Sequence, residues 1–242
     1  MGGPMLHKAK KWILSGATAP ASKSVAHRML IENGFILPTA KGFYSLLPLG
    51  QRVIDKLCRI LDSEFQKSGA MKIGMPIVGT KQLWDRTKRW EAMGSEMIKF
   101  EDRQKAQLCL QVEKIWSTPT AEEMCTDLIG QLSPLKKSQF PVMLYQIGEK
   151  FRDEMNPRFG LMRARQFLMK DMYTFSLDSE SSQKTYQKIS RVYERIFGEQ
   201  LQLADDLIKI DFNDFWGAKR REIRPGREAE GDQKGFCVYP RE

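Results

Sequence analysis

Histidine, cysteine and long hydrophobic runs are scarce in this 242-residue sequence, and each scarcity excludes a class of chemistry. The only histidines are His7 and His27, both near the N-terminus, which argues against a histidine general base. The four cysteines form no C-x-x-C pair and have no histidine neighbours, so structural zinc is not expected and a reduced compartment is the simpler interpretation. No apolar run approaches the roughly 20 residues of a membrane helix, so no membrane partner is expected.

Acidic residues are absent from residues 1–31, although this stretch carries Lys8, Lys10, Lys11, Lys23 and Arg28. Much of the chain's net charge of +9 therefore lies in this leader and is not a signal for DNA binding. We expect residues 1–23 to be either a mitochondrial transit peptide or a disordered basic arm. The localisation that follows is the mitochondrial matrix, with the cytoplasm as the alternative.

What the sequence does contain is a hairpin pattern over residues 141–154 and 163–177. Alternation with period 2 places Arg152 and Glu154 on one face of the first strand, and the same face carries Gln146 and Lys150. The opposite face, which we expect to be buried, carries Met143, Tyr145, Ile147 and Phe151. After a turn-rich loop, a single face of the second strand carries Arg163, Phe167 and Asp171. The hairpin therefore presents arginines, carboxylates and an aromatic ring together.

This set of side chains suits a nucleotide. Guanidinium groups pair with phosphates, a flat ring stacks on a base, and a carboxylate accepts from an exocyclic amine. The alternative is a cross-strand surface pair between Arg152 and Glu154, worth well under about 1 kcal/mol. That alternative does not explain Arg163, Phe167 and Asp171 on the matching face.

The pattern resembles motif 2 of class II aminoacyl-tRNA synthetases, in the version of prolyl-tRNA synthetases of bacterial and mitochondrial type. The resemblance runs from about Ser24 to about Phe197. Its further landmarks, in chain order, are Gly42-Phe43-Tyr44, Leu47-Pro48, Met75-Pro76, Leu83-Trp84, Arg89-Trp90, Pro119-Thr120 with Glu122-Glu123, and Tyr145-Gln146-Ile147. It implies an α+β fold in which a partial antiparallel sheet of the class II type is flanked by helices, with a catalytic core over residues 24–203.

The resemblance also implies a reaction, namely the attachment of proline to its tRNA through an ATP-derived prolyl-adenylate. Arg152 would contact the α-phosphate and the substrate carboxylate, as the catalytic residue. Glu154 would accept from the adenine amine, Phe167 would stack on the base, and Arg163 would hold the γ-phosphate. ATP and Mg²⁺ are the implied cofactors, with the metal bridging phosphates and no metal site formed by the protein.

The proline site is expected at the start of a helix over residues 120–132. The resemblance implies that Thr120 and Glu122 bind the imino nitrogen of proline. A secondary ammonium group in an apolar pocket needs a carboxylate and a neutral hydrogen-bond acceptor nearby. The alternative for this segment is a capping box formed by Thr120 and Glu123. The two interpretations are compatible because they use different glutamates.

Two further segments carry expectations about assembly. Residues 50–67 form an amphipathic helical pattern ending near Gly69, and Met71–Val78 is predicted to be a strand that Pro76 confines to an edge. This unit resembles motif 1, which implies a homodimer; the alternative is an ordinary helix and strand. A last helix is expected over residues 180–203.

The sequence also departs from the family. Gln166 replaces a glutamate, and no G-x-G pair or other sign of motif 3 is present in the polar residues 204–242, where an anticodon-binding domain is also absent. Because a phosphate-clamping arginine is worth roughly 10³–10⁵ in rate, we expect this chain alone to catalyse proline-dependent ATP–pyrophosphate exchange at least about a thousandfold more slowly than a full-length relative. The alternative function is an inactive, truncated or paralogous synthetase-like interaction protein.

Overall fold

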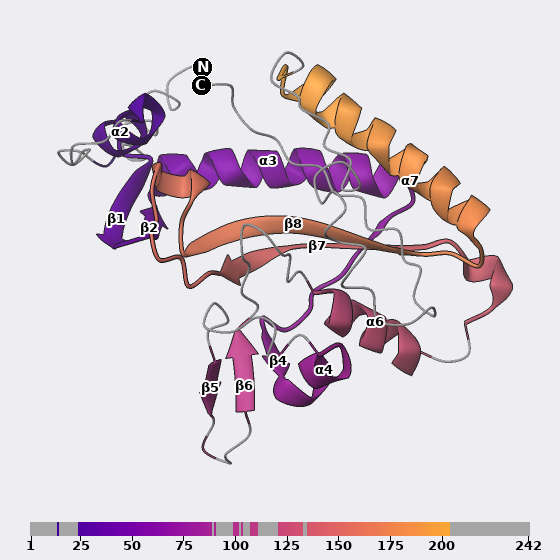
Figure 1. Ribbon diagram of the computed structural model, residues 1–242. Coiled ribbons are helices and arrows are strands. Elements are labelled where there is room, and N and C mark those ends of the chain that lie inside the picture. The colour runs from indigo at the N-terminus through magenta and orange to yellow at the C-terminus, as the bar shows by residue number, and fades with distance from the viewer. Residues whose placement is uncertain are drawn as a thin grey trace, which may run out of the picture. The chain divides into compact units, whose positions relative to one another are not determined.

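The computed structural model describes residues 14, 24–88, 90, 99–101, 103, 107–110, 121–132 and 135–203. Helices and small antiparallel sheets are mixed along the chain, so the predicted α+β class is confirmed (Figure 1). The chain divides into two compact units. The first contains the described residues within 1–59, 72–135 and 144–173, and the second those within 60–71, 136–143 and 174–242.

The first unit begins with a helix and a two-stranded hairpin. Helix α2 (Val25–Glu32) starts at Ser24, whose side chain accepts a hydrogen bond from the His27 amide. Strand β1 (Ile36–Ala40) pairs antiparallel with β2 (Phe43–Leu46). The turn between these strands contains Gly42 at φ +82°, a conformation that side-chain-bearing residues rarely adopt.

Helix α3 (Pro48–Lys67) confirms the amphipathic helix predicted over residues 50–67. Gly69 follows it at φ +83°, as expected of a glycine just past a helix end. The single strand predicted over Met71–Val78 is wrong, because only β3 (Met71–Lys72) and β4 (Val78–Thr80) are strands. Pro76 lies in the interruption, where it lacks an N–H and biases the preceding residue away from helix. β3 does lie at the edge of its sheet.

A three-stranded sheet of order β4-β6-β5 is formed with β5 (Lys99–Glu101) and β6 (Gln107–Leu110), and both pairings are antiparallel. Helix α4 (Lys81–Arg86) follows β4 directly. Its Trp84 is buried together with Trp90, and Leu83 packs against the pair. The Leu83-Trp84 landmark of the sequence is therefore part of a small apolar cluster.

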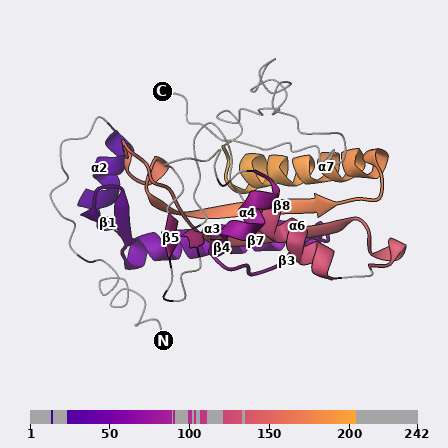
Figure 2. The same cartoon turned by 60° about the horizontal axis from the view of Figure 1, so that its bottom comes forward.

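The predicted hairpin is confirmed as β7 (Val142–Phe151) and β8 (Gln166–Phe175), which are neighbours in a sheet of order β3-β7-β8. Figures 1 and 2 both show the two strands side by side, running in opposite directions in Figure 1. The expectation that β7 has one open and one buried face is wrong, because residues 142–146 are all buried and Gln146 and Lys150 are each 4% exposed. Period 2 tells which residues share a face, but not what covers that face.

Helix α6 (Glu122–Gln131) confirms the helix predicted near residues 120–132. Its N-cap residue is Ala121, which makes no side-chain cap, and Thr120, on which the capping-box alternative depends, lies outside the described residues. The backbone N–H of Ala121 instead donates to the Tyr173 hydroxyl of β8 at 2.6 Å. Two 3₁₀ turns, η2 (Lys137–Gln139) and η3 (Gly160–Met162), lie before β7 and in the hairpin loop.

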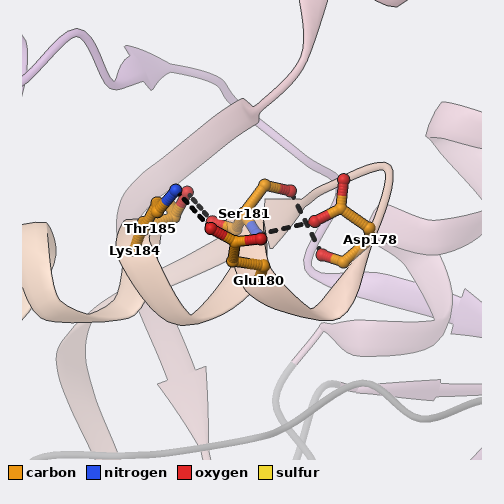
Figure 3. Close-up of polar contacts among 5 residues, drawn as sticks. All are labelled: Asp178, Glu180, Ser181, Lys184 and Thr185. Atoms are coloured by element: carbon orange, nitrogen blue, oxygen red, sulfur yellow. Dashed lines mark hydrogen bonds and ion pairs between the residues drawn. The ribbon is translucent and has the colours of Figure 1, made fainter.

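In the second unit, α7 (Ser179–Glu194) and the π-helical turn η4 (Arg195–Gln200) confirm the helix predicted over residues 180–203, with a change of winding near its end. Asp178 caps α7 by accepting from the Ser181 amide at 2.7 Å, and Thr185 donates to the Ser181 carbonyl one turn later at 2.8 Å (Figure 3). The Lys184–Glu180 pair adds a contact on the surface of the same turn.

The end of α3 packs on α7 within this second unit. Phe65 is fully buried and meets the Tyr193 ring edge-on, with centroids 5.3 Å apart. Beside it, Glu64 accepts from Lys67 at 2.6 Å and from Arg195 at 3.3 Å. None of the described helices has the length and apolar character needed to cross a membrane.

Candidate active site

The loop of the β7–β8 hairpin brings the predicted phosphate-binding residues together. Strand pairing continues past the end of β7, because the Arg152 amide donates to the Arg165 carbonyl at 2.6 Å. At the far end of the loop, the Arg158 amide donates to the Arg163 carbonyl at 3.2 Å. Arg152 and Glu154 therefore lie just beyond β7, and Arg163 just before β8, on facing sides of one hairpin.

Glu154 and Arg163 form a partly buried ion pair. Arg163 Nε donates to Glu154 Oε2 at 2.9 Å, and the Asn156 amide donates to Oε1 at 3.1 Å. Burial raises the pKa of the Glu154 carboxyl, but these hydrogen bonds and the charges of Arg163 and Arg152 outweigh it, so the pKa lies below its ordinary value. Glu154 is consequently an anion at neutral pH.

Arg152 lies over the ring of Phe167, with its guanidinium carbon 4.8 Å from the ring centroid. This distance is within the range of a cation–π contact. The contact joins the end of β7 to the start of β8. This contact confirms the sequence prediction that Arg152 and Phe167 share a surface. The ion pair confirms the same prediction for Glu154 and Arg163.

A second polar cluster lies further along the same hairpin, around Asp171. Gln146 Nε2 donates to Asp171 Oδ2 at 2.9 Å, and the Tyr173 hydroxyl donates to the same oxygen. Asp171 is only 7% exposed, and its Oδ1 is buried with no hydrogen-bond partner among the described residues. A buried carboxylate oxygen in this state favours a cationic or hydrogen-bond-donating ligand.

Glu122 begins α6 next to this cluster. The pKa of the Cys125 thiol is raised to about 12, mainly by burial. The negative charges of Asp171 and Glu122 add to this increase. The two carboxylates therefore share one neighbourhood. Thr120, the other residue predicted to bind proline, lies outside the described residues.

Helix α6 is held in place by α4. Thr87 Oγ1, just past α4, donates to Glu123 Oε1 at 3.0 Å, and Arg86 pairs with Asp127 at 2.9 Å. Glu123 thus anchors the helix, while the charge of the adjacent Glu122 acts on Cys125 together with that of Asp171. The partner of Glu123 in the structure is Thr87, and the role of Glu122 in binding proline stays a prediction.

Tyr173 and Gln146 were not among the site residues expected from the sequence. Both continue the period-2 pattern that contains Arg152, Phe167 and Asp171, which is the signal that could have identified them. Phe167 and Asp171, four residues apart in one strand, lie about 13 Å from each other along it. The hairpin therefore carries a cationic and aromatic end and an acidic end on one face.

Lys170 is a half-buried lysine next to Asp171 in β8, and burial lowers its pKa to about 7, against the opposing effect of the Asp171 charge. Between pH 7 and the unfolded lysine's pKa of about 10.4, the unfolded state binds more protons, so stability should rise with pH. We expect the free energy of unfolding of the wild type, relative to Lys170→Met, to increase between pH 7 and 9 by at most about 1.4 kcal/mol per pH unit. Urea unfolding at several pH values measures it.

The matched control is Lys184→Met, which removes an exposed lysine from α7 and should give no such slope. Parallel pH profiles for the wild type and Lys170→Met would contradict the assignment.

The described residues do not form a metal site of their own, since no group of three or more His, Cys, Asp or Glu side chains is gathered among them. They do suit a polyanion attached to a flat ring, because Arg152 and Arg163 are cationic and the Phe167 ring is adjacent. A nucleoside triphosphate fits the two guanidinium groups and the ring better than a bare metal ion does.

Comparison with known proteins gives consistent matches. The family model of the tRNA synthetase class II core domain (G, H, P, S and T) matches residues 99–224, just over half of the chain. This range begins and ends later than the resemblance from about Ser24 to about Phe197 that the sequence motifs indicated.

The chain is also similar to individual proteins. It is 42% identical over 212 residues to a probable mitochondrial proline–tRNA ligase of Rattus norvegicus, covering 88% of this chain and 43% of that protein. It is 38% identical over 206 residues to the proline–tRNA ligase of Geobacter metallireducens, covering 85% and 35%. A Giardia lamblia prolyl-tRNA synthetase solved with prolyl-adenylate has a TM-score of 0.60 at 17% identity, over 68% of this chain and 33% of that chain, which supports the fold alone. The chain thus spans less than half the length of these relatives.

Proposed function

Because the chain belongs to the class II tRNA synthetase core family, we propose that it forms part of an enzyme that activates proline with ATP and transfers it to the tRNA for proline. The observation that carries this proposal is the hairpin of β7 and β8, where Arg152 lies 4.8 Å over the Phe167 ring beside the Glu154–Arg163 ion pair. Proline as the amino acid follows from the named relatives at 37–42% identity.

ATP would lie along this hairpin with its base near Phe167. Glu154 has one hydrogen bond on each carboxylate oxygen, and a carboxylate has about four lone-pair sites, so it can accept a further bond from the adenine amine. Arg163 uses Nε for Glu154, which leaves its two terminal nitrogens to face the γ-phosphate. In this arrangement the ion pair orients both partners before ATP arrives.

Proline would bind at the acidic end of the hairpin. Its secondary ammonium group would be held by Glu122 and Thr120, and Asp171 would supply a second negative charge nearby. The hydrogen bonds from Gln146 and Tyr173 fix Asp171 Oδ2, while Oδ1 has no partner among the described residues. A bound ammonium would relieve the cost of two neighbouring buried carboxylates.

Activation of the proline carboxylate depends more on the orientation of the two substrates than on a general base. The proline carboxylate oxygen attacks the α-phosphorus, a new P–O bond forms, and the bond to pyrophosphate breaks with the electron pair leaving on pyrophosphate. Arg152 would stabilise the charge on the α-phosphate, and Arg163 the charge on the leaving group. ATP is proposed to bind as its Mg²⁺ complex with the metal held by phosphate oxygens, and no step depends on a metal site in the protein.

The assembly and location remain part of the proposal. A homodimer through the α3 and β3 region is supported by the resemblance of this segment to motif 1. A mitochondrial location is supported by the mitochondrial relatives in Rattus norvegicus, Mus musculus and Homo sapiens, and the similar bacterial enzymes leave the cytoplasm as the alternative.

Proline-dependent ATP–pyrophosphate exchange tests the proposal. A fusion of this chain with the remaining part of a proline–tRNA ligase that is about 40% identical to it should catalyse ATP–pyrophosphate exchange only when proline is present. Alanine should not replace proline in this assay. Absence of exchange, together with a correctly folded protein that still dimerises, would favour the second candidate, a non-catalytic interaction protein.

A further inference from the structure

His27 is a buried side chain that the proposed reaction does not use. It is the only histidine among the described residues, lies in α2, and is 7% exposed. Its ring meets Tyr44 of β2 edge-on, with centroids 5.6 Å apart. Its Nδ1 is buried without a hydrogen-bond partner in the described part of the chain. Burying a polar atom in this state costs free energy.

The imidazole lies directly against the backbone of Gly160 in the hairpin loop. A Cβ placed on Gly160 would overlap His27 Nδ1 and lie 3.0 Å from Cγ. Gly160 has φ +64°, and the residue before it, Phe159, has φ +59° although it carries a side chain. Conformations of this kind cost roughly 1–3 kcal/mol for residues other than glycine and persist only where the surroundings impose them.

Gly42, in the turn between β1 and β2, makes a second close approach to the same loop. Its carbonyl accepts from the Arg165 amide at 2.7 Å. A Cβ on Gly42 would lie 2.9 Å from Pro157 Cβ and 2.9 Å from Arg165 Cγ. The segment α2–β1–β2 therefore contacts the loop at both of its sides, through His27 on Gly160 and through Gly42 on Pro157 and Arg165.

We propose that His27 is a positioning residue, which holds the loop of residues 155–162 in the conformation that places Arg163 against Glu154. The contact acts on the loop three residues before Arg163, whose Nε donates to Glu154 Oε2 at 2.9 Å. Loss of the ring would let Phe159 and Gly160 leave their left-handed conformations, and Arg163 would lose its fixed position. The part of this inference that concerns ATP rests on the proposed function, whereas the part that concerns the loop does not.

Hydrogen–deuterium exchange of the 242-residue chain tests the loop directly. In His27→Ala we expect amides of residues 156–165 to exchange at least about tenfold faster, while those of residues 168–173 in β8 stay as in the wild type. Met29→Ala, an exposed position in the same helix, is the matched control and should change neither. His27→Phe keeps the ring and should restore loop protection, which a general loss of stability would not allow.

Gly160→Ala changes the other partner of the contact. It can test the proposal even if His27→Ala does not fold. The added Cβ meets the imidazole, so the loop amides should again exchange faster. Gly148→Ala is its control, because a Cβ on Gly148 has nothing within 4 Å. Loop exchange within about twofold of wild type in both His27→Ala and Gly160→Ala, or equal acceleration over the whole chain in both, would overturn the proposal.

ATP titration of the same variants separates this inference from the proposed function. The proposal expects His27→Ala to raise the Kd for ATP by about tenfold and His27→Phe to leave it near wild type. Faster loop exchange with unchanged ATP affinity would overturn the role in positioning Arg163. A wild-type chain that binds ATP no better than Arg152→Ala would instead contradict the proposed function, and the exchange data would still decide on the loop.

Discussion

Arg152→Ala is expected to abolish measurable ATP binding by the 242-residue chain. The substitution removes the guanidinium that lies over Phe167 at the end of β7. Hydrogen bonds to charged groups are worth about 1.5–3 kcal/mol each, so loss of a bidentate phosphate contact should raise the Kd by about a hundredfold or more. Isothermal titration with ATP, with circular dichroism to confirm folding, measures the effect.

Arg158→Ala is the matched control for this prediction. Arg158 is an exposed arginine of the same loop whose guanidinium carbon lies 5.2 Å from the centroid of the Phe159 ring, and it has no proposed contact with ATP. The Kd of this variant for ATP should stay within about threefold of wild type, since an exposed charge without a contact to the nucleotide contributes little. Equal losses in both variants would show that general positive charge, and not Arg152, binds the nucleotide.

Glu122→Gln is expected to remove proline binding while leaving ATP binding intact. The change keeps the size of the side chain and deletes the negative charge that we assign to the imino group. Removing one partner of a charged hydrogen bond costs about 1.5–3 kcal/mol, so the Kd for proline should rise by roughly tenfold to a hundredfold. Equilibrium dialysis with labelled proline measures this, and ATP titration of the same protein should match the wild type.

Glu123→Gln provides the comparison within the same helix turn. Glu123 accepts from Thr87 and anchors α6, so this variant should unfold at a lower temperature with little change in proline affinity. If Glu123→Gln weakened proline binding as much as Glu122→Gln, the two glutamates would not have the separate tasks that we propose.

Local patterns in the sequence were sufficient to predict the hairpin and the helices α3, α6 and α7. Alternation in Val142–Phe151 and Gln166–Phe175 predicted β7 and β8, and the apolar spacing before Gly69 predicted α3, because these signals come from residues close together in the chain. The contact of Arg152 with Phe167 followed from hairpin pairing. Such short-range rules predicted which residues of the hairpin lie together at the site.

Long-range packing explains what the sequence did not predict. The Tyr173 hydroxyl meets the Ala121 amide across 52 residues, and Gly160 lies against the ring of His27, which belongs to α2. Gln146 and Lys150 were expected on an open face, but both are buried because other elements cover that face. A pattern of alternation contains no information about such partners, so these parts of the site required the fold.

The most direct test of the account is calorimetric binding of a prolyl-sulfamate analogue of prolyl-adenylate to this chain, compared with its alanyl counterpart. In the proposed arrangement the analogue would span both ends of the hairpin, and it would engage the Arg152 and Phe167 end and the Glu122 and Asp171 end at once. We expect the prolyl compound to bind at least about tenfold more tightly than the alanyl compound, and Arg152→Ala and Glu122→Gln each to weaken it. Equal affinity for the two compounds, or binding of the prolyl compound that survives Arg152→Ala, would contradict the account.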